Sequence, residues 1–267
     1  MRLKKTLLTI VIAALLATSF FAPQPVAQQV VRRPIAVSAS FNPSDFLAGL
    51  GCFYDADRIS GNDSDPVVDW LDLSGNNKHY GQDTSANQPT LKKNIVNGHA
   101  VVRFATNDFL TQDPNPCPAT TANTLIIVCT PSSTASTYIL GGDGGEGTPA
   151  IISGFSSTAF EYYNFSSERA TFASSASGFH ILAITRTDDT GNFKLFYDGT
   201  EVVSTAVNTT NDWNGRSWQE IGNNGNAVGD NFYNGDIAMI IKFDQNHAGA
   251  AGLTNLFDAL RTHFGTP

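Results

Sequence analysis

Basic residues are scarce in this sequence, which carries 16 Lys and Arg against 24 Asp and Glu. Three basic residues (Arg2, Lys4 and Lys5) and none of the acids lie in the first 27 positions, so the rest of the chain has a net charge of 13 − 24 = −11. A chain this acidic repels phosphate backbones, and no basic patch offsets the repulsion. We therefore expect no nucleic-acid partner.

Long apolar runs are missing after residue 21, and the one run present is short for a membrane span. It covers Thr6 to Phe21, "TLLTIVIAALLATSFF", after the basic stub "MRLKK" and before the small residues of "APQPVAQQ". This layout is typical of a secretory signal peptide, here cleaved after Ala27. We expect a signal peptide or hydrophobic segment at 1–27, a linker or arm at 28–40 and one domain at 41–267. Because Pro25 weakens the cleavage site, the alternatives are an uncleaved anchor and a hydrophobic arm buried in an assembly.

Cysteine is also rare, with only Cys52, Cys117 and Cys129 in the chain. In an exported protein this number suggests one disulfide and one remaining thiol. A bond between Cys117 and Cys129 would close a short loop, but Cys52 could equally pair with either of them. Cys52 and Cys129 both lie in apolar runs, so the opposing interpretation is that they are small buried hydrophobic residues.

Short β-branched and aromatic segments, separated by Gly, Asn, Asp and Ser, fill most of the chain and predict an all-β sandwich of two antiparallel sheets. Two of them, "TLIIVCT" (124–130) and "FHILAITR" (179–186), are apolar on both faces, as strands covered on both sides would be. The other predicted strands are 99–104, 137–142, 150–155, 159–165, 192–199, 218–222 and 236–243.

Only the C-terminus has helical periodicity. Its apolar residues recur at intervals of three and four and predict one amphipathic helix lying on the sandwich, which Gly265 and Pro267 end. The predicted buried stripe consists of Leu253, Leu256, Phe257, Leu260 and Phe264.

Several stretches between Phe41 and Gly265 resemble the LamG-like jelly rolls of the concanavalin A-like lectin/glucanase superfamily, the kind found in exported bacterial proteins and in phage virions. They include "VVDWLDLSGNNKHYGQDTSANQPTLKKN", "NGHAVVRFATNDFLT", "GNFKLFYDGTEV" and "LFDALRTHFG". The resemblance implies a single jelly-roll domain. It also implies that the element at 70–77 is a tight turn in which Trp70 faces the core, Asp72 and Ser74 bond turn amides, and Gly75 supplies an unusual backbone angle.

Catalysis is not expected from the acids present. Glucanases of this superfamily carry a Glu-x-Asp-x-x-Glu strand, but the five Glu of this chain do not have that spacing, and the Gln-x-His pattern of the alginate lyases is absent too. His180 lies in a predicted buried strand, where a lone His is more often a core residue with satisfied hydrogen bonds than a base. The five Glu are Glu146, Glu161, Glu168, Glu201 and Glu220.

Sugar binding is the better-supported function, because aromatic faces beside amides and carboxylates suit sugar rings and hydroxyls. Trp213 lies in the polar loop "NTTNDWNGR", although folding of its indole over the sheet edge is an equal alternative. The predicted ligand-binding residues are Trp213, Asp212, Asn214 and Arg216, with Tyr162, Tyr163 and Tyr233 as secondary candidates.

Calcium is the one metal that the acidic loops suggest, since hard cations take carboxylate oxygens from flexible loops. The candidate ligands are Asp55, Asp57 and Asp108, although a solvated acidic loop explains them as well.

We therefore expect a non-catalytic, lectin-like module, secreted or displayed on a cell surface, whose partner is a glycan or cell-surface polysaccharide. The alternatives are a phage virion or surface-layer protein that packs against other subunits, and a polysaccharide hydrolase or lyase.

Overall fold

The computed structural model describes residues 41–112, 117–118, 122–131, 137–142, 149–153, 160–164, 168–173, 177–187, 192–206, 217–223 and 232–267. The chain separates into two compact units, Met1–Phe41 and Asn42–Pro267. Apart from Phe41, the first unit lies outside the described residues, as do the predicted signal peptide and linker. In the described part of the chain, no helix is both long enough and apolar enough to cross a membrane.

Sheet A contains eight antiparallel strands and includes the apolar segments predicted to be central. Its middle strand β18 pairs with β8 along one edge and with β1 and β5 along the other. From one side to the other the order is β15 (Thr200–Ala206), β14 (Asn192–Tyr197), β13 (His180–Arg186), β8 (Asn123–Cys129), β18 (Asp236–Phe243), β5 (His99–Arg103) and β4 (Thr90–Val96), with β1 (Leu50–Asp55) also on β18.

Sheet B is antiparallel as well, and its strands are shorter toward one end. Its order is β12 (Glu168–Ala173), β11 (Phe160–Asn164), β10 (Pro149–Ser153), β9 (Thr137–Gly141), β17 (Glu220–Ile221), β6 (Leu110–Gln112), β3 (Tyr80–Gly81) and β2 (Asp69–Trp70). A separate pair joins β7 (Cys117–Pro118) to β16 (Ser217–Trp218), so the segment predicted as one strand at 218–222 is divided between two pairings. Three 3-10 turns, η1 (Pro43–Asp45), η2 (Ala56–Arg58) and η3 (Ser85–Asn87), complete the described elements before the helix.

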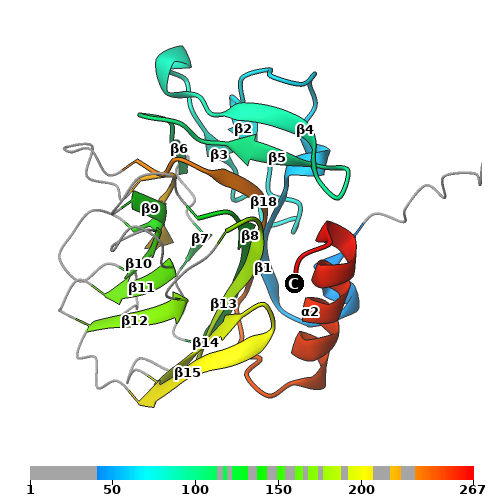
Figure 1. Ribbon diagram of the computed structural model, residues 1–267, viewed down its shortest axis with the longest axis vertical. Helices are drawn as coiled ribbons and strands as arrows, with labels where there is room; N and C mark the ends of the chain where they lie inside the picture. Colours follow the sequence, from blue (N-terminus) through cyan, green and yellow to red (C-terminus); the bar gives the residue numbers. More distant parts are fainter. Residues whose placement is uncertain are drawn as a thin grey trace, which may run out of the picture. The chain divides into compact units, whose positions relative to one another are not determined.

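The hydrophobic core lies between the two sheets, and sheet A is covered on its other face by helix α2 (Ala251–Phe264) (Figure 1). The burial of alternate residues along β8 shows that the strand is covered on both faces. Leu125 and Ile127 belong to the core cluster, whereas Ile126 and Val128 are equally buried but lie on the opposite face. The double covering explains why this strand has no polar face, and the predicted all-β sandwich with a C-terminal helix is confirmed.

Helix α2 buries the stripe that its periodicity predicted, namely Leu253, Leu256, Phe257, Leu260 and Phe264. The ring of Phe257 packs against Phe196 of β14, with centroids 5.6 Å apart. Gly265 ends the helix in the left-handed conformation at φ 63°, which glycine adopts without a Cβ clash. Each large apolar side chain buried in this way contributes roughly 1.5–3 kcal/mol, so the helix is an integral part of the sandwich.

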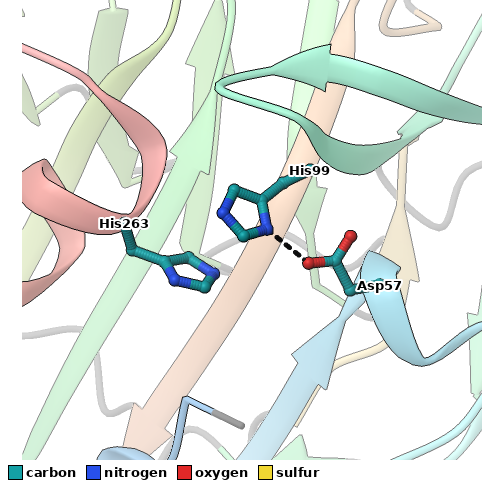
Figure 2. Close-up of side chains that lie close together, drawn as sticks. All are labelled: Asp57, His99 and His263. Atoms are coloured by element: carbon teal, nitrogen blue, oxygen red, sulfur yellow. Dashed lines mark hydrogen bonds and ion pairs between the residues drawn. The ribbon is translucent and has the colours of Figure 1, made fainter. Parts of the chain in front are cut away.

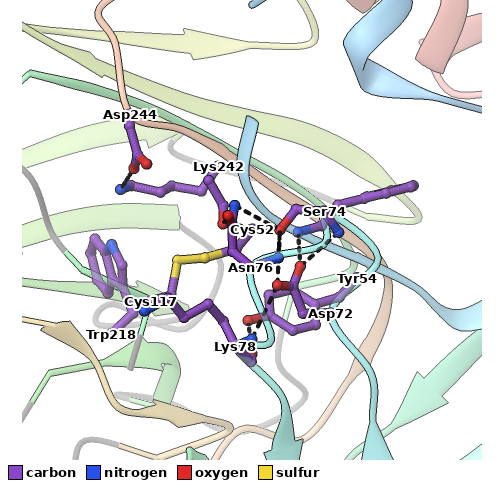
Figure 3. Close-up of a disulfide and its surroundings, with 12 residues drawn as sticks. Cys52, Tyr54, Asp72, Ser74, Asn76, Lys78, Cys117, Trp218, Lys242 and Asp244 are labelled. Atoms are coloured by element: carbon purple, nitrogen blue, oxygen red, sulfur yellow. Dashed lines mark hydrogen bonds and ion pairs between the residues drawn. A yellow bond between two sulfur atoms is a disulfide. The ribbon is translucent and has the colours of Figure 1, made fainter. Parts of the chain in front are cut away.

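The disulfide joins Cys52 of β1 to Cys117 of β7 (Figure 3). Cys129 is a buried free thiol. The pairing is one that the sequence left open, and it closes a separation of 65 residues. The short-loop pairing of Cys117 with Cys129 is therefore not the one formed. Cys129 instead occupies a core position on β8, as expected of a small hydrophobic residue.

The segment at 70–77 is the tight turn that the family resemblance implied (Figure 3). Trp70 is 1% exposed and lies in the core. The Asp72 carboxylate accepts hydrogen bonds from the backbone N–H groups of Phe53, Ser74 and Lys78 at 2.9–3.1 Å. Gly75 has φ 89°, a left-handed value that side chains disfavour. These residues hold the turn against β1, so they act in the scaffold.

Candidate ligand-binding groove and histidine cluster

A cavity of about 300 Å³ opens beside η2 and the segment that leads into the Asp72 turn. Along this segment Val67 and Trp70 are buried, while Val68, Leu71 and Leu73 stay 40–54% exposed. The cavity is lined by Asp55, Arg58, Ile59, Ser60, Pro66, Val67, Val68, Asp69, Trp70, Leu71 and Leu73. This set combines an apolar surface with two carboxylates and one guanidinium, and we call it the η2 groove.

Two ionic side chains of the groove lining, Asp55 and Arg58, give the groove a hydrogen-bond acceptor and a donor. Asp55 is 4% exposed and caps η2 by accepting from the N–H of Asp57 at 3.0 Å. Burial raises the pKa of Asp55 to about 6, although the Asp57 N–H bond and the Arg58 charge oppose the rise. The Arg58 Nε lies 3.9 Å from the Asp55 carboxylate and its side chain is half exposed. Arg58 can therefore donate to a ligand, while Asp55 can accept from one.

On the side of η2 that faces β5, Asp57 meets two histidines from distant parts of the chain (Figure 2). His99 opens β5 and places its Nδ1 2.5 Å from Asp57 Oδ2. His263 comes from the last turn of α2, and its ring centroid lies 3.8 Å from that of His99. One ligand atom from each residue lies within 4.8 Å of the others, so the three make a compact group of metal-ligating atoms.

The electrostatics of this Asp57–His99–His263 cluster keep one imidazole uncharged. Burial and the neighbouring His99 ring lower the pKa of His263 to about 4, while the charge of Asp57 acts in the opposite direction. The second oxygen of Asp57, Oδ1, accepts from the backbone N–H of Ala100 at 2.6 Å, which fixes the carboxylate at the start of β5. Metal ions bind histidine as the neutral imidazole and aspartate as the deprotonated carboxylate.

No protein-family model matches the sequence, and no curated protein matches it. The fold is nevertheless similar to solved structures. A Trypanosoma rangeli sialidase in complex with sialic acid aligns with TM-score 0.52 and 15% identity, over 81% of this chain and 33% of that one. The ligand-binding domain of botulinum neurotoxin serotype D in complex with N-acetylneuraminic acid aligns with TM-score 0.54 and 9% identity, over 81% and 52% of the two chains.

Botulinum neurotoxin type C, whose cell entry depends on two ganglioside molecules, aligns with TM-score 0.52 and 15% identity, over 82% of this chain and 53% of that one. The chain thus spans about a third of the sialidase and about half of the neurotoxin chains. At these identities the likeness establishes a shared β-sandwich fold.

The structure corrects two of the predicted sugar-binding residues. Tyr162 is 3% exposed and Tyr233 is fully buried, so neither presents its ring to a ligand. Tyr162 packs on Phe193, and Tyr233 donates its hydroxyl to the carbonyl of Thr130 at 2.6 Å. Because neighbouring residues of a strand point to opposite faces, one ring of an adjacent pair such as Tyr162 and Tyr163 is expected to point outward, but alternation alone does not show which one. The other predicted residues, Trp213, Asp212, Asn214 and Arg216, lie outside the residues that the structure describes. The side chain of Tyr163 lies outside them as well.

The three predicted calcium ligands are not brought together as a set. Asp55 caps η2, and Asp108 Oδ2 accepts from the N–H of Ala105 at 2.8 Å within its own turn. Only Asp57 joins a group of metal-ligating atoms, and its companions are His99 and His263. Nothing in the sequence pointed to these histidines, because their spacing matches no ligand motif and the fold alone brings them together.

Proposed function

We propose that this chain is an exported, non-catalytic carbohydrate-binding module built as a LamG-like jelly roll of the concanavalin A-like superfamily. The η2 groove on a sandwich shared with sugar-binding proteins is the observation that carries this proposal. Two of the similar structures hold sialic acid, and a third protein depends on gangliosides, so acidic glycans are the first class of ligand to examine.

The lining of the groove supports this proposal chemically. A pyranose ring offers an apolar face and a rim of hydroxyls, which need apolar contact together with a few oriented donors and acceptors. Val68 and Leu71 provide exposed apolar surface, while Arg58 and Asp69 provide charged groups on the same groove. A guanidinium also pairs bidentately with a carboxylate, the group that distinguishes sialic acid from neutral sugars.

The absence of catalysis is part of the proposal and rests on the spacing of the acids. Glycoside hydrolases use two carboxyl groups on either side of the bond that they cleave. None of the five Glu in the sequence has the spacing found in glucanases. The raised pKa of Asp55 follows first from its burial, and its carboxylate is engaged in capping η2.

A glycan array that includes sialylated and ganglioside-type glycans tests the proposal. We expect the full chain to bind, and Leu71→Ser to reduce binding at least several-fold without lowering the melting temperature, because Leu71 is 54% exposed. Ile95→Ser is the matched control, since Ile95 is 40% exposed on β4 outside the groove. Trp213→Ala tests whether the loop around Trp213, predicted from the sequence to bind the sugar, contributes to binding.

Three results would contradict parts of this proposal. Loss of binding in Trp213→Ala but not in Leu71→Ser would move the site from the groove to the loop. Binding to no glycan, together with assembly into multimers, would favour a structural role in a virion or surface layer. Glycan cleavage by the wild type that Asp55→Asn abolishes would show that the module is an enzyme.

A further inference from the structure

We propose that Asp57, His99 and His263 form a binding site for a divalent transition-metal ion of the zinc class, and that the ion fastens helix α2 to sheet A. This goes beyond carbohydrate binding, because the cluster lies on the β5 side of η2 and none of its three residues lines the groove.

The geometry of the cluster is close to that of a coordination sphere (Figure 2). Zinc bonds imidazole nitrogen and carboxylate oxygen at about 2.0–2.2 Å, so two tetrahedral ligands lie about 3.3 Å apart. The atoms of the cluster lie within 4.8 Å of one another. His99 Nδ1 and Asp57 Oδ2 are at 2.5 Å, the distance of a hydrogen bond. A bound ion would replace that hydrogen bond, with side-chain rotations moving this pair slightly apart and His263 inward.

Each ligand is already held by a contact that metal binding leaves intact. Asp57 Oδ1 keeps its bond to the Ala100 N–H, and Oδ2 is left to coordinate. The backbone of His263 is tied to the β4–β5 turn, where Asn97 Nδ2 donates to its carbonyl oxygen at 2.8 Å. Both imidazoles also pack edge-on against Phe264, at centroid distances of 5.4 and 4.7 Å. Such supporting contacts orient ligands and raise metal affinity.

The kind of ion follows from the ligand atoms. Two imidazoles and one carboxylate suit zinc, copper, nickel or cobalt, whereas calcium requires six to eight oxygen ligands. Three protein ligands leave a fourth position for water, and the side chains of Asp57 and His99 are 32% and 20% exposed. An ion can therefore reach the site from solvent without opening the core.

The three ligands come from η2, from β5 and from the C-terminal turn of α2. Positions 57, 99 and 263 converge only in the folded domain, so the unfolded chain offers no such site. An ion that binds the native state selectively stabilises it by mass action. The structural consequence is a cross-link between the last turn of the helix and the sheet that the helix covers.

The test measures the melting temperature of the full chain, purified without a histidine tag, with added zinc, calcium or magnesium. At free zinc about 100 times the dissociation constant, we expect a rise of roughly 5–10 °C that EDTA reverses. Calcium and magnesium should give no comparable rise. Cobalt should give the visible absorption of a tetrahedral site and provides a readout independent of stability.

His263→Gln, His99→Gln and Asp57→Asn should each remove most of the zinc-dependent rise, measured against the metal-free melting temperature of the same variant. His247→Gln is the matched control, because His247 precedes α2 and bonds the carbonyl of Ala48 at 3.0 Å, outside the cluster. It should keep the full rise. If a variant is too unstable to melt cooperatively, its cobalt spectrum decides. The proposal is overturned if zinc leaves the wild type unchanged, if His247→Gln loses the rise equally, or if the three cluster variants all retain it.

Discussion

The imidazole of His180 lies across the β13–β14 hairpin from the carboxylate of Asp198, with Nδ1 2.8 Å from Oδ2. Its other nitrogen, Nε2, lies 3.0 Å from the carbonyl oxygen of Ser177. Both partners are acceptors, so only the imidazolium, which carries a proton on each nitrogen, satisfies both. Burial lowers the pKa of His180, but the hydrogen bond and charge of Asp198 outweigh it and the pKa is raised overall. His180 is thus the satisfied core residue that the sequence predicted.

Stability should consequently fall as the pH rises above the ordinary pKa of histidine, about 6.5. Because the pKa of His180 is higher in the folded than in the unfolded chain, its contribution is complete below about pH 6.5 and is lost as the pH rises through the folded pKa. Urea unfolding over about pH 5–9 measures this. Asp198→Asn keeps the left-handed backbone at φ 50°, which Asn tolerates, and should flatten the pH dependence. It should also cost about 1.5–3 kcal/mol at low pH. Parallel pH curves for wild type and variant would refute the assignment.

Removing the Asp72 carboxylate should destabilise the domain far more than removing a groove carboxylate. Asp72→Ala leaves the N–H groups of Phe53, Ser74 and Lys78 without their acceptor. Each orphaned buried donor costs about 1–3 kcal/mol, so the variant should lose about 3 kcal/mol or more. Asp69→Ala, at an exposed position three residues away on β2, should change the unfolding free energy by less than about 0.5 kcal/mol. Equal effects in chemical denaturation would show that the turn does not anchor β1.

Trimming the buried face of α2 should reveal how tightly the helix belongs to the sandwich. Leu256→Ala removes a fully buried side chain between α2 and sheet A and should cost about 2–5 kcal/mol. Asn255→Ala, one position away on the exposed face, should be neutral or slightly stabilising because Ala favours helices. Truncation after Asp244 removes the whole stripe and should yield unfolded or aggregated protein. A truncated chain that melts within a few degrees of the parent would mean that the helix is dispensable.

The cysteines should show distinct reactivities. A thiol reagent should label no cysteine in the native oxidised protein, because burial shields the Cys129 thiol and raises its pKa. After unfolding without reductant it should label Cys129 alone, because Cys52 and Cys117 stay joined. Replacing Cys52 and Cys117 by Ala should cost about 2–4 kcal/mol, because their bond spans 65 residues. Labelling of more than one cysteine without reductant would contradict this pairing, whereas rapid labelling of one in the native protein would contradict the burial of Cys129.

The strands and helix were predictable because their signals are local. Strand β13 follows from its continuous run of apolar residues and the stripe of α2 from helical periodicity, whereas the turn at 70–77 was implied by the family resemblance. Several strands with weaker patterns were not anticipated. In β4, for example, Lys93, Asn94 and Ile95 are all exposed, and this run interrupts the alternation that identifies a strand.

The candidate sites were much less predictable because they depend on contacts between distant residues. The sequence left three pairings open for the cysteines, and only the placement of β1 beside β7 decides among them. Likewise, His99 and His263 meet because the last turn of α2 lies beside the start of β5, a contact that no pattern in either segment encodes. Tyr233 was a secondary candidate for ligand binding, yet it lies outside any strand, where alternation has no fixed phase, and its ring is buried.

The pairing of β1 with β18 has a consequence for biosynthesis. Leu50 of β1 lies opposite Phe243 of β18, which is 243 − 50 = 193 residues later in the chain. Because synthesis starts at the N-terminus, β1 cannot be paired with β18 along its length until those 193 residues have been made. Contacts of such long sequence separation form slowly, and the unpaired edges exposed meanwhile invite association between chains. Folding must therefore follow synthesis of nearly the whole domain. A nascent chain that stops before β18 therefore exposes unpaired strands and is a substrate for chaperones and proteases.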